Sequence, residues 1–190
     1  MNNEELLLSM IIIAKNNADD LERCLKSVQG LVDEIILVDT GSTDKTKEIA
    51  GRYTYKIYDF KWTNNFSDAK NYALKWTKGK WVINLDADES LSKKDHSKLL
   101  ELLKNTPRNV LGFSLIQRNY INKIGQFGWV SSTADDYEES KVANGFVPRR
   151  IVRLFKNSSE ILFEGAVHDS VEKSIIKMEG IIEDAKIPIH

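Results

Sequence analysis

Short apolar runs recur along the first half of the chain, and polar residues follow each of them. The runs are rich in Ile, Val and Leu and far too short to span a bilayer, so they predict strands buried in a sheet. The strands expected from this pattern lie at residues 10–14, 34–40, 56–60 and 80–85.

Helical periodicity occupies the intervals between the strands. Apolar residues at i, i+3, i+4 and i+7 predict an amphipathic helix at residues 19–28, with an aspartate as its N-cap and Gly30 after its end. A second helix is expected after the "GSTDKT" turn, with Ser42 or Thr43 as its N-cap, and should run to about Arg52.

A third helix is predicted over residues 66–77, with one face formed by Phe66, Ala69, Ala73 and Trp76. Strands and helices therefore alternate, with short connections, over the first half of the chain. This order is typical of an α/β fold in which helices cover both faces of a mostly parallel central sheet.

The second half follows a different pattern, with longer strands and an acidic segment that lacks a clear period. The predicted elements are a helix at 92–104 capped by Ser92, a strand at 110–121, a mobile loop at 131–141, and strands at 149–157 and 187–190. We expect the last two strands to be antiparallel and to lie at the sheet edge.

Composition fits one compact domain over residues 1–190, because 42% of the residues are hydrophobic and 29% are charged. The formal net charge of −1 provides no overall basic field, so nucleic acid is not an expected partner. Cys24 is the only cysteine, which fits a reducing compartment. The apolar stretch "LLLSMIIIA" follows acidic residues and is too short for a membrane span. We therefore expect a cytoplasmic protein without a transmembrane segment.

Three acids in four positions follow the strand at residues 80–85. Asp86, Asp88 and Glu89 repel one another and resist burial, so either a solvated turn begins here or a cation is held here. Two carboxylates two residues apart at a strand end can bind a hard divalent ion such as Mn²⁺ or Mg²⁺. The position at the C-terminal end of a parallel strand favours the ligand site.

Other polar positions are also candidates for chemistry. Asp39 can accept hydrogen bonds from a nucleotide, although "DTGSTDKT" equally fits an ordinary turn into a helix. Lys70 can meet a diphosphate near helix-terminal amides, or be a solvated lysine. His168 and Asp169 suit acid–base work or metal binding, and His190 ends an apparent strand. The sequence contains neither a P-loop nor a dinucleotide fingerprint.

Several of these stretches together resemble glycosyltransferase family 2 on the GT-A fold. The matching words are "MIIIAKNNADDLERCLKSV", "DEIILVDTGSTDKTKEIA", "WTNNFSDAKNYAL" and "GKWVINLDADE". They are similar to a bacterial branch that includes lipopolysaccharide-core and peptide glycosyltransferases. The resemblance covers residues of about 8–90 strongly and 148–190 more loosely, which implies a nucleotide-sugar half before about residue 90 and an acceptor and metal half after it.

For the nucleotide, the resemblance implies roles at the ends of the first strands. Ala14, Lys15 and Asn16 would border the nucleobase, and Asp39 would bind the uridine or its ribose. Lys70 stands where many relatives have arginine next to the diphosphate. Lysine offers a point charge without the bidentate fork of arginine.

For the sugar and the metal, the resemblance implies a second group of residues. Asp86 would reach the ribose or sugar, and Asp88 would bind Mn²⁺ or Mg²⁺. His190 would complete the metal shell, with His168 as the second candidate. Asp169 would be the general base, although relatives tend to have the longer glutamate there.

The implied activity is metal-assisted, inverting transfer from a UDP-sugar to a glycan, lipid or peptide acceptor. Two alternatives remain: a non-catalytic nucleotide-sugar-binding or scaffolding domain, and a sugar nucleotidyltransferase, whose usual Gly-rich loop is absent from "IIIAKNNADD". Because relatives usually continue with further regions, the chain is also compatible with a fragment of a longer protein. Peripheral attachment at the inner membrane face stays open.

Overall fold

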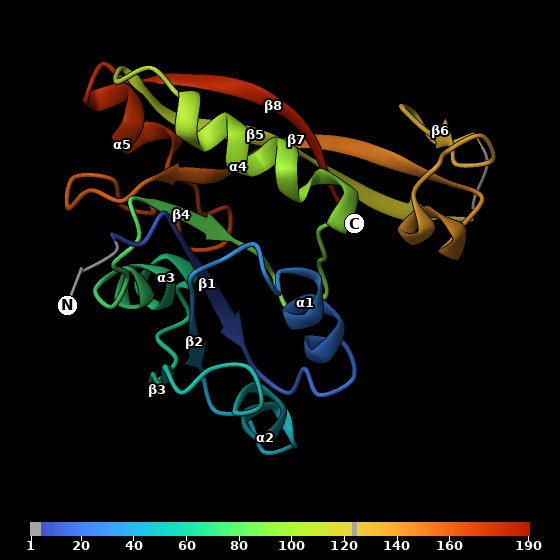
Figure 1. Cartoon of the computed structure of the whole chain (residues 1–190). Helices are drawn as coiled ribbons and strands as arrows, with labels where there is room; N and C mark the ends of the chain where they lie inside the picture. The colour runs from blue at the N-terminus through green and yellow to red at the C-terminus, as the bar shows by residue number, and fades with distance from the viewer. Residues whose placement is uncertain (1–4, 123–124) are drawn as a thin grey trace.

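The computed structural model describes residues 5–122 and 125–190 (Figure 1). Within this part, eight strands form one sheet in the order β3-β2-β1-β4-β7-β5-β8, with β6 paired to β7. The strands are β1 (Leu8–Ala14), β2 (Glu34–Asp39), β3 (Ile57–Asp59), β4 (Trp81–Asn84), β5 (Val110–Ile121), β6 (Val130–Ser131), β7 (Gly145–Lys156) and β8 (Ile181–Ile189). The helices are α1 (Leu21–Ser27), α2 (Thr46–Ala50), α3 (Phe66–Leu74), α4 (His96–Asn105) and α5 (Glu172–Lys177), with 3-10 turns η1 (Lys93–Asp95) and η2 (Glu138–Val142).

The first four strands form a parallel half-sheet, as the alternation of strands and helices predicts. β1 pairs in parallel with β2 and β4, and β2 pairs in parallel with β3. Every residue of β2 and β4 is buried, as expected of strands with helices on both faces. The C-terminal ends of these strands therefore bring Asp39 and residues 86–90, here called the acid turn, to the same edge of the sheet.

The second half of the chain corrects the prediction about edge strands. The strand expected at residues 149–157 is the end of β7, which lies inside the sheet and runs antiparallel to both β4 and β5. Residues 152–155 are all buried, as expected of a strand with neighbours on both sides. The strand expected at residues 187–190 is the end of β8, which does lie at an edge of the sheet as predicted, but it is parallel to β5 rather than antiparallel.

Helices cover both faces of the sheet. Apolar residues of α1, α2 and α4 pack on one face, and those of α3 and α5 pack on the other. The predicted face of the third helix is right for Ala69 and Ala73, which are fully buried. It is wrong for Phe66 and Trp76, each of which is 41% exposed. Because α3 ends at Leu74, Trp76 lies beyond the helix, and its ring stacks on a tyrosine ring. No helix of the described residues is long and apolar enough to cross a membrane.

The start of α2 also differs from the prediction. The helix begins at Thr46, and Asp44 rather than Ser42 or Thr43 accepts a hydrogen bond from the Thr46 N–H, at 2.9 Å. Ser42 and Thr43 instead bind Asn16 in the neighbouring loop. Their contribution is therefore to the shape of the strand-end loops and not to the helix.

Two other N-caps have the predicted position but not the predicted contact. Asp20 precedes α1 and Ser92 precedes η1, yet neither side chain accepts a capping hydrogen bond. The helix predicted from residue 92 opens as the 3-10 turn η1 and becomes α4 at His96. The core face of these helices, rather than a cap, holds them in place.

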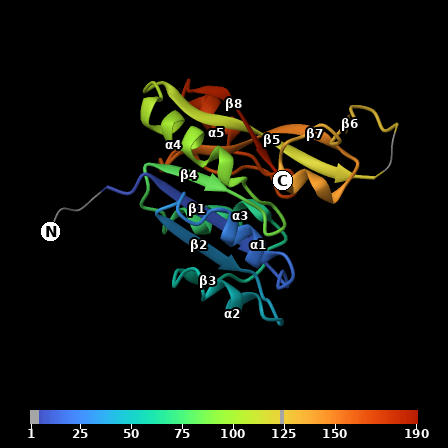
Figure 2. The same ribbon diagram turned by 45° about the vertical axis from the view of Figure 1, so that its right-hand side comes forward.

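β5 and β7 continue past the rest of the sheet as an arm, to which β6 is paired (Figures 1 and 2). The segment 131–141, predicted as a mobile loop, here contains the end of β6 and most of η2, and its Asp135 pairs with Arg118 at 2.5 Å. The last residue returns to the acid turn: Ser90 N–H donates to the His190 carbonyl at 2.7 Å, and His190 N–H donates to the Ser90 carbonyl at 2.9 Å.

Candidate functional site at the carboxyl ends of the strands

The loops after β1 and β2 bring the first group of predicted residues together. Ala14 and Asp39 are register partners at the ends of these strands. The Asn16 N–H donates to Ser42 Oγ at 2.9 Å, and Asn16 Oδ1 accepts from the Thr43 N–H at 2.8 Å. Each loop therefore fixes the other, so the edge over β1 and β2 is a preformed surface.

Asp39 is buried in this surface, with 1% of the residue exposed. Its Oδ1 accepts hydrogen bonds from the backbone N–H groups of Gly41 and Ser42, at 3.0 and 2.9 Å. Its Oδ2 is also buried and has no hydrogen-bond partner in the described part of the chain. Because such an oxygen is costly to leave unpaired, it is suited to receive a ligand's hydroxyl or N–H. Lys15 lies nearby with an exposed side chain.

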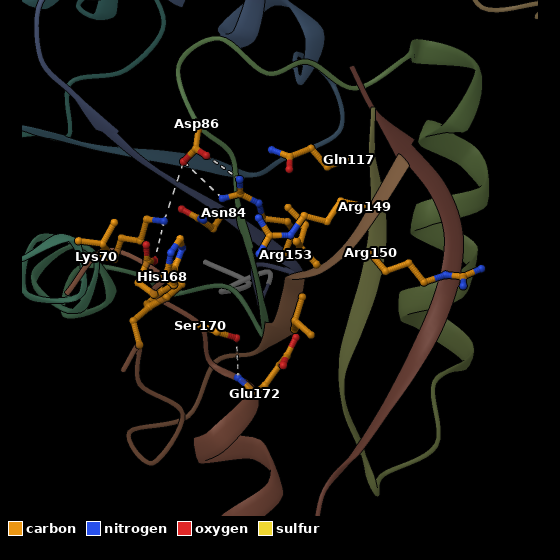
Figure 3. Close-up of a pocket in the computed structure, with 15 residues that line it drawn as sticks. Lys70, Asn84, Asp86, Gln117, Arg149, Arg150, Arg153, His168, Ser170 and Glu172 are labelled. Atoms are coloured by element: carbon orange, nitrogen blue, oxygen red, sulfur yellow. Dashed lines mark hydrogen bonds and ion pairs between the residues drawn. The ribbon is translucent and has the colours of Figure 1, made fainter. Parts of the chain in front are cut away.

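Lys70, Asp86 and Asp169 meet in a cavity of about 310 Å³, here called the Lys70 cavity (Figure 3). Lys70 comes from α3, Asp86 follows β4, and Asp169 lies before α5. Lys70 Nζ is 2.7 Å from Asp169 Oδ2 and 3.9 Å from Asp86 Oδ1. Only 5% of Lys70 is exposed, so the two carboxylates balance an ammonium group that is largely removed from water.

A buried arginine that the sequence reasoning missed holds the acid turn. Arg153 on β7 is 7% exposed, and its Nη1 and Nη2 donate to the two Asp86 carboxylate oxygens at 3.3 and 2.5 Å. Its Nη2 also donates to Glu89 Oε1 at 2.9 Å. The other oxygen, Glu89 Oε2, accepts from the Asp86 N–H at 2.9 Å, and Gln117 Nε2 donates to Glu89 Oε1 at 2.6 Å. Glu89 therefore stabilises the turn through the hydrogen bonds of both its carboxylate oxygens.

These contacts shift the pKa values of the two acids in opposite directions. Burial tends to raise both, but at Asp86 the charge and hydrogen bonds of Arg153 prevail and hold the pKa below its ordinary value. At Glu89, burial prevails over the Arg153 charge, and the nearby Asp86 charge adds to it, so the pKa is raised. Asp86 is thus ionised at neutral pH.

Asp88 and His190 line a second cavity of about 480 Å³, here called the Asp88 cavity. The Asp88 side chain is exposed, and its main-chain carbonyl accepts from Arg23 Nη2 at 2.5 Å. Unlike Asp86, which has Lys70 and Arg153, its carboxylate has no ion-pair partner among the described residues. Gln117 lines both cavities, so they adjoin at the acid turn.

His190 is held between two tyrosine rings. The Tyr120 ring stacks on the imidazole, and the Tyr137 ring lies 4.8 Å away between centroids. Tyr120 Oη is 2.5 Å from Nδ1, whereas Nε2 is buried without a hydrogen-bond partner in the described residues. Burial lowers the pKa of His190 to about 4, so the imidazole is neutral at pH 7. A neutral imidazole is the form that ligates metal ions.

Asp88, with its exposed carboxylate, and His190, with its unpartnered Nε2, are the candidate donors for a divalent cation among the residues that line the Asp88 cavity. Within the described ranges, no three or more His, Cys, Asp or Glu side chains are grouped as a metal site. Two protein donors suit an ion that takes its other ligands from phosphate and water, as Mg²⁺ commonly does. His168, the second metal candidate, is exposed and lines the Lys70 cavity instead.

Arg153 escaped prediction because nothing local marks its contacts. It lies 67 residues after Asp86, inside the strand-like word "RRIVRLFKN". One signal was available: a charged residue within an apolar strand is rarely buried unless it is paired. That signal says a partner exists, but it does not say which acid it is.

Comparison with protein families decides the class of the molecule. A family model described as "Glycosyl transferase family 2" matches residues 9–156, from β1 to the end of β7. The chain belongs to this family. The resemblance found in the sequence and the prediction of an enzyme of this family are therefore confirmed.

Related sequences include proteins much longer than this glycosyltransferase chain. A TPR repeat-containing protein of Synechococcus elongatus is 32% identical over 173 residues, which cover 90% of this chain and 37% of that protein. The glycosyltransferase SunS of Bacillus subtilis is 26% identical over 160 residues, which cover 83% of this chain and 33% of that protein. The chain thus spans about a third of the length of these two relatives.

Solved structures confirm the GT-A α/β fold. A mannosyltransferase of Pyrobaculum calidifontis, in complex with GDP-Man and Mn²⁺, matches with a TM-score of 0.63 and 16% identity over 98% of this chain and 57% of that one. Glucosyl-3-phosphoglycerate synthase of Mycobacterium tuberculosis, in complex with Mn²⁺ and UDP-glucose, matches with a TM-score of 0.61 and 16% identity over 96% of this chain and 70% of that one.

Proposed function

We propose that this glycosyltransferase domain moves a sugar from a UDP-sugar to a glycan, lipid or peptide acceptor. The observation that carries the proposal is the pairing of two features on either side of β1: the unpartnered oxygen of Asp39 and the acid turn at Asp86. Their placement matches the rule that ligands of parallel sheets bind at the carboxyl ends of the strands. Fold relatives solved with UDP-glucose or GDP-Man support a nucleotide-sugar donor.

The nucleotide is assigned to the edge over β1 and β2. Ala14, Lys15 and Asn16 border the base, and Asp39 Oδ2 accepts a hydrogen bond from the uracil or the ribose. The diphosphate is assigned to Lys70, whose ammonium group lies between Asp169 and Asp86. A bound diphosphate would share this ammonium group with the Asp169 carboxylate.

The sugar is assigned to the Lys70 cavity and the cation to the Asp88 cavity. Asp86, held by Arg153, accepts hydrogen bonds from hydroxyl groups of the ribose or sugar. Mn²⁺ or Mg²⁺ held by Asp88 and His190 would offset the charge that develops on the leaving diphosphate.

Asp169 is the proposed general base. Its carboxylate takes the proton of the acceptor hydroxyl while that oxygen attacks the anomeric carbon and the bond to the diphosphate oxygen breaks. A single displacement of this kind inverts the configuration at the anomeric carbon. Asp169 and Asp86 share one cavity and one lysine, which supports a base located next to the proposed sugar position.

Calorimetric titration with UDP, GDP, CDP and ADP, each with and without Mn²⁺, tests the donor assignment. We expect UDP to bind most tightly and only in the presence of Mn²⁺, and Asp39→Asn to weaken it. The absence of binding by every nucleotide would favour the scaffolding alternative. Release of pyrophosphate from UTP and a sugar 1-phosphate would favour the nucleotidyltransferase alternative.

A further inference from the structure

Two acids of one turn have opposite surroundings. Asp86 contacts two cations, Arg153 and Lys70, whereas the Asp88 carboxylate has no ion-pair partner among the described residues. Only Ala87 separates them, and it is 4% exposed. The difference therefore arises from groups that reach the turn from other elements, and among these groups Arg153 binds both Asp86 and Glu89.

We infer that Arg153 is a positioning residue of the donor site: it fixes the acid turn so that Asp88, and not Asp86, faces the cation. The inference rests on the proposed function. Arg153 binds both oxygens of Asp86 and one oxygen of Glu89, while the Asp86 N–H binds the other oxygen of Glu89. The contacts form a closed loop in which neither acid can rotate without breaking a hydrogen bond.

These charged groups are buried, so the loop of hydrogen bonds offsets the cost of their desolvation only when every contact in it is made. Arg153 is 7% and Glu89 is 6% exposed, and a buried charge is costly unless hydrogen-bonded counter-charges surround it. The planar guanidinium presents its donors in a fixed fork that matches two carboxylate oxygens at once. Lysine provides one ammonium group and cannot reproduce that fork, so Arg153→Lys keeps the charge and removes the geometry.

The interior position of β7 explains why this arginine can reach the turn. Ile83 on β4 pairs with Leu154 on β7, so Arg153 lies next to the carboxyl end of β4. Arg52, just beyond the end of α2, pairs with Glu48 at 2.9 Å and lines neither the Lys70 cavity nor the Asp88 cavity. Arg52 therefore provides a control for the replacement of an ion-paired arginine by lysine.

The first test compares Arg153→Lys with Arg52→Lys by titration of UDP in the presence of Mn²⁺. Changes to groups that orient metal ligands typically cost about 10–100-fold in affinity or activity. We expect Arg153→Lys to weaken UDP binding about 10–100-fold while its unfolding midpoint stays close to that of wild type. We expect Arg52→Lys to bind UDP normally. Unchanged UDP affinity in Arg153→Lys overturns the inference, as does a loss that occurs only where the variant is unfolded.

The second test does not depend on any nucleotide. Unfolding midpoints of wild type, Arg153→Met, Asp86→Asn and the double variant form a double-mutant cycle. In the wild-type background, Arg153→Met leaves the Asp86 carboxylate without its arginine partner. Asp86→Asn removes that carboxylate, so we expect Arg153→Met to lower the unfolding midpoint less in the Asp86→Asn background. Equal shifts in both backgrounds overturn the Arg153–Asp86 contact. If wild type binds no nucleotide, the proposed function fails, and this cycle still decides whether Arg153 holds the turn.

Discussion

The Lys70 cavity and the Asp88 cavity adjoin at one turn but differ in how their charges are arranged. In the Lys70 cavity, Asp86 and Asp169 are both ion-paired. In the Asp88 cavity, the Asp88 carboxylate has no ion pair among the described residues, and His190 Nε2 has no partner there. Cations and aromatic rings from distant strands give the two acids of the D-x-D motif different surroundings. The motif alone therefore does not assign roles to them.

The largest effect on sugar transfer should come from Asp169, the proposed base in the Lys70 cavity. Asp169→Asn removes the proton acceptor, and general bases typically contribute about 10²–10⁴-fold to the rate. We expect a loss of transfer in that range, with UDP affinity in Mn²⁺ retained, measured by release of UDP from a UDP-sugar and by calorimetry. Near-normal turnover would move the base to another residue.

The next largest effect on sugar transfer should come from Asp88 in the Asp88 cavity. A cation contributes several kcal/mol to charge stabilisation on a leaving group, so Asp88→Ala should reduce turnover on the order of 10²-fold. The Mn²⁺-dependent affinity for UDP should fall as well. Glu101→Ala, an exposed acid on α4, is the control. If both variants behave alike, the cation is bound by other groups.

A smaller effect on Mn²⁺-dependent binding is expected at His190, the second proposed cation ligand of the Asp88 cavity. His190→Gln replaces the imidazole with a weaker ligand that keeps an amide in the same space. We expect Mn²⁺-dependent UDP affinity to fall about tenfold, within the range found for changes around metal sites. His96→Gln on α4 is the control. Unaltered Mn²⁺ dependence in His190→Gln would leave His190 as a packing residue between Tyr120 and Tyr137.

The smallest effect concerns the hydrogen bond behind that imidazole. For Nε2 to bind a cation, Nδ1 must carry the proton and donate it to Tyr120 Oη, 2.5 Å away. Tyr120→Phe keeps the stacked ring and removes this acceptor, which is worth about 1 kcal/mol, or roughly fivefold in Mn²⁺ affinity. Tyr55→Phe, at a residue 91% exposed, is the control. Equal Mn²⁺ affinity in both variants would show that the hydrogen bond does not orient the imidazole.

The sequence was sufficient for the parallel half of the fold because its signals are local. Apolar runs, helical stripes and polar strand ends locate β1 to β4 with the helices between them, and thereby Asp39 and Asp86 at one edge. It was insufficient for β7, since the segment 151–155, apolar except for Arg153, fits both an edge strand and an interior strand. Pairing across the sheet decides between these, and a linear pattern does not contain it.

Site residues followed the same division. Asp86 and Asp88 lie two residues apart in a recognisable motif, so the sequence predicts both of them, but their different surroundings depend on Arg153, Lys70 and His190. The Lys70–Asp169 contact joins α3 to the loop before α5, and its distance of 2.7 Å depends on tertiary packing. The roles of these residues stay predictions, as does the cytoplasmic location.

The central claim is that Asp88 holds the cation while Asp86 is held by Arg153. Electron paramagnetic resonance of free Mn²⁺, measured during titration of the protein with saturating UDP, tests it most directly. The account predicts that wild type and Glu101→Ala remove Mn²⁺ from solution and that Asp88→Asn does not. Normal Mn²⁺ binding by a folded Asp88→Asn variant would contradict it.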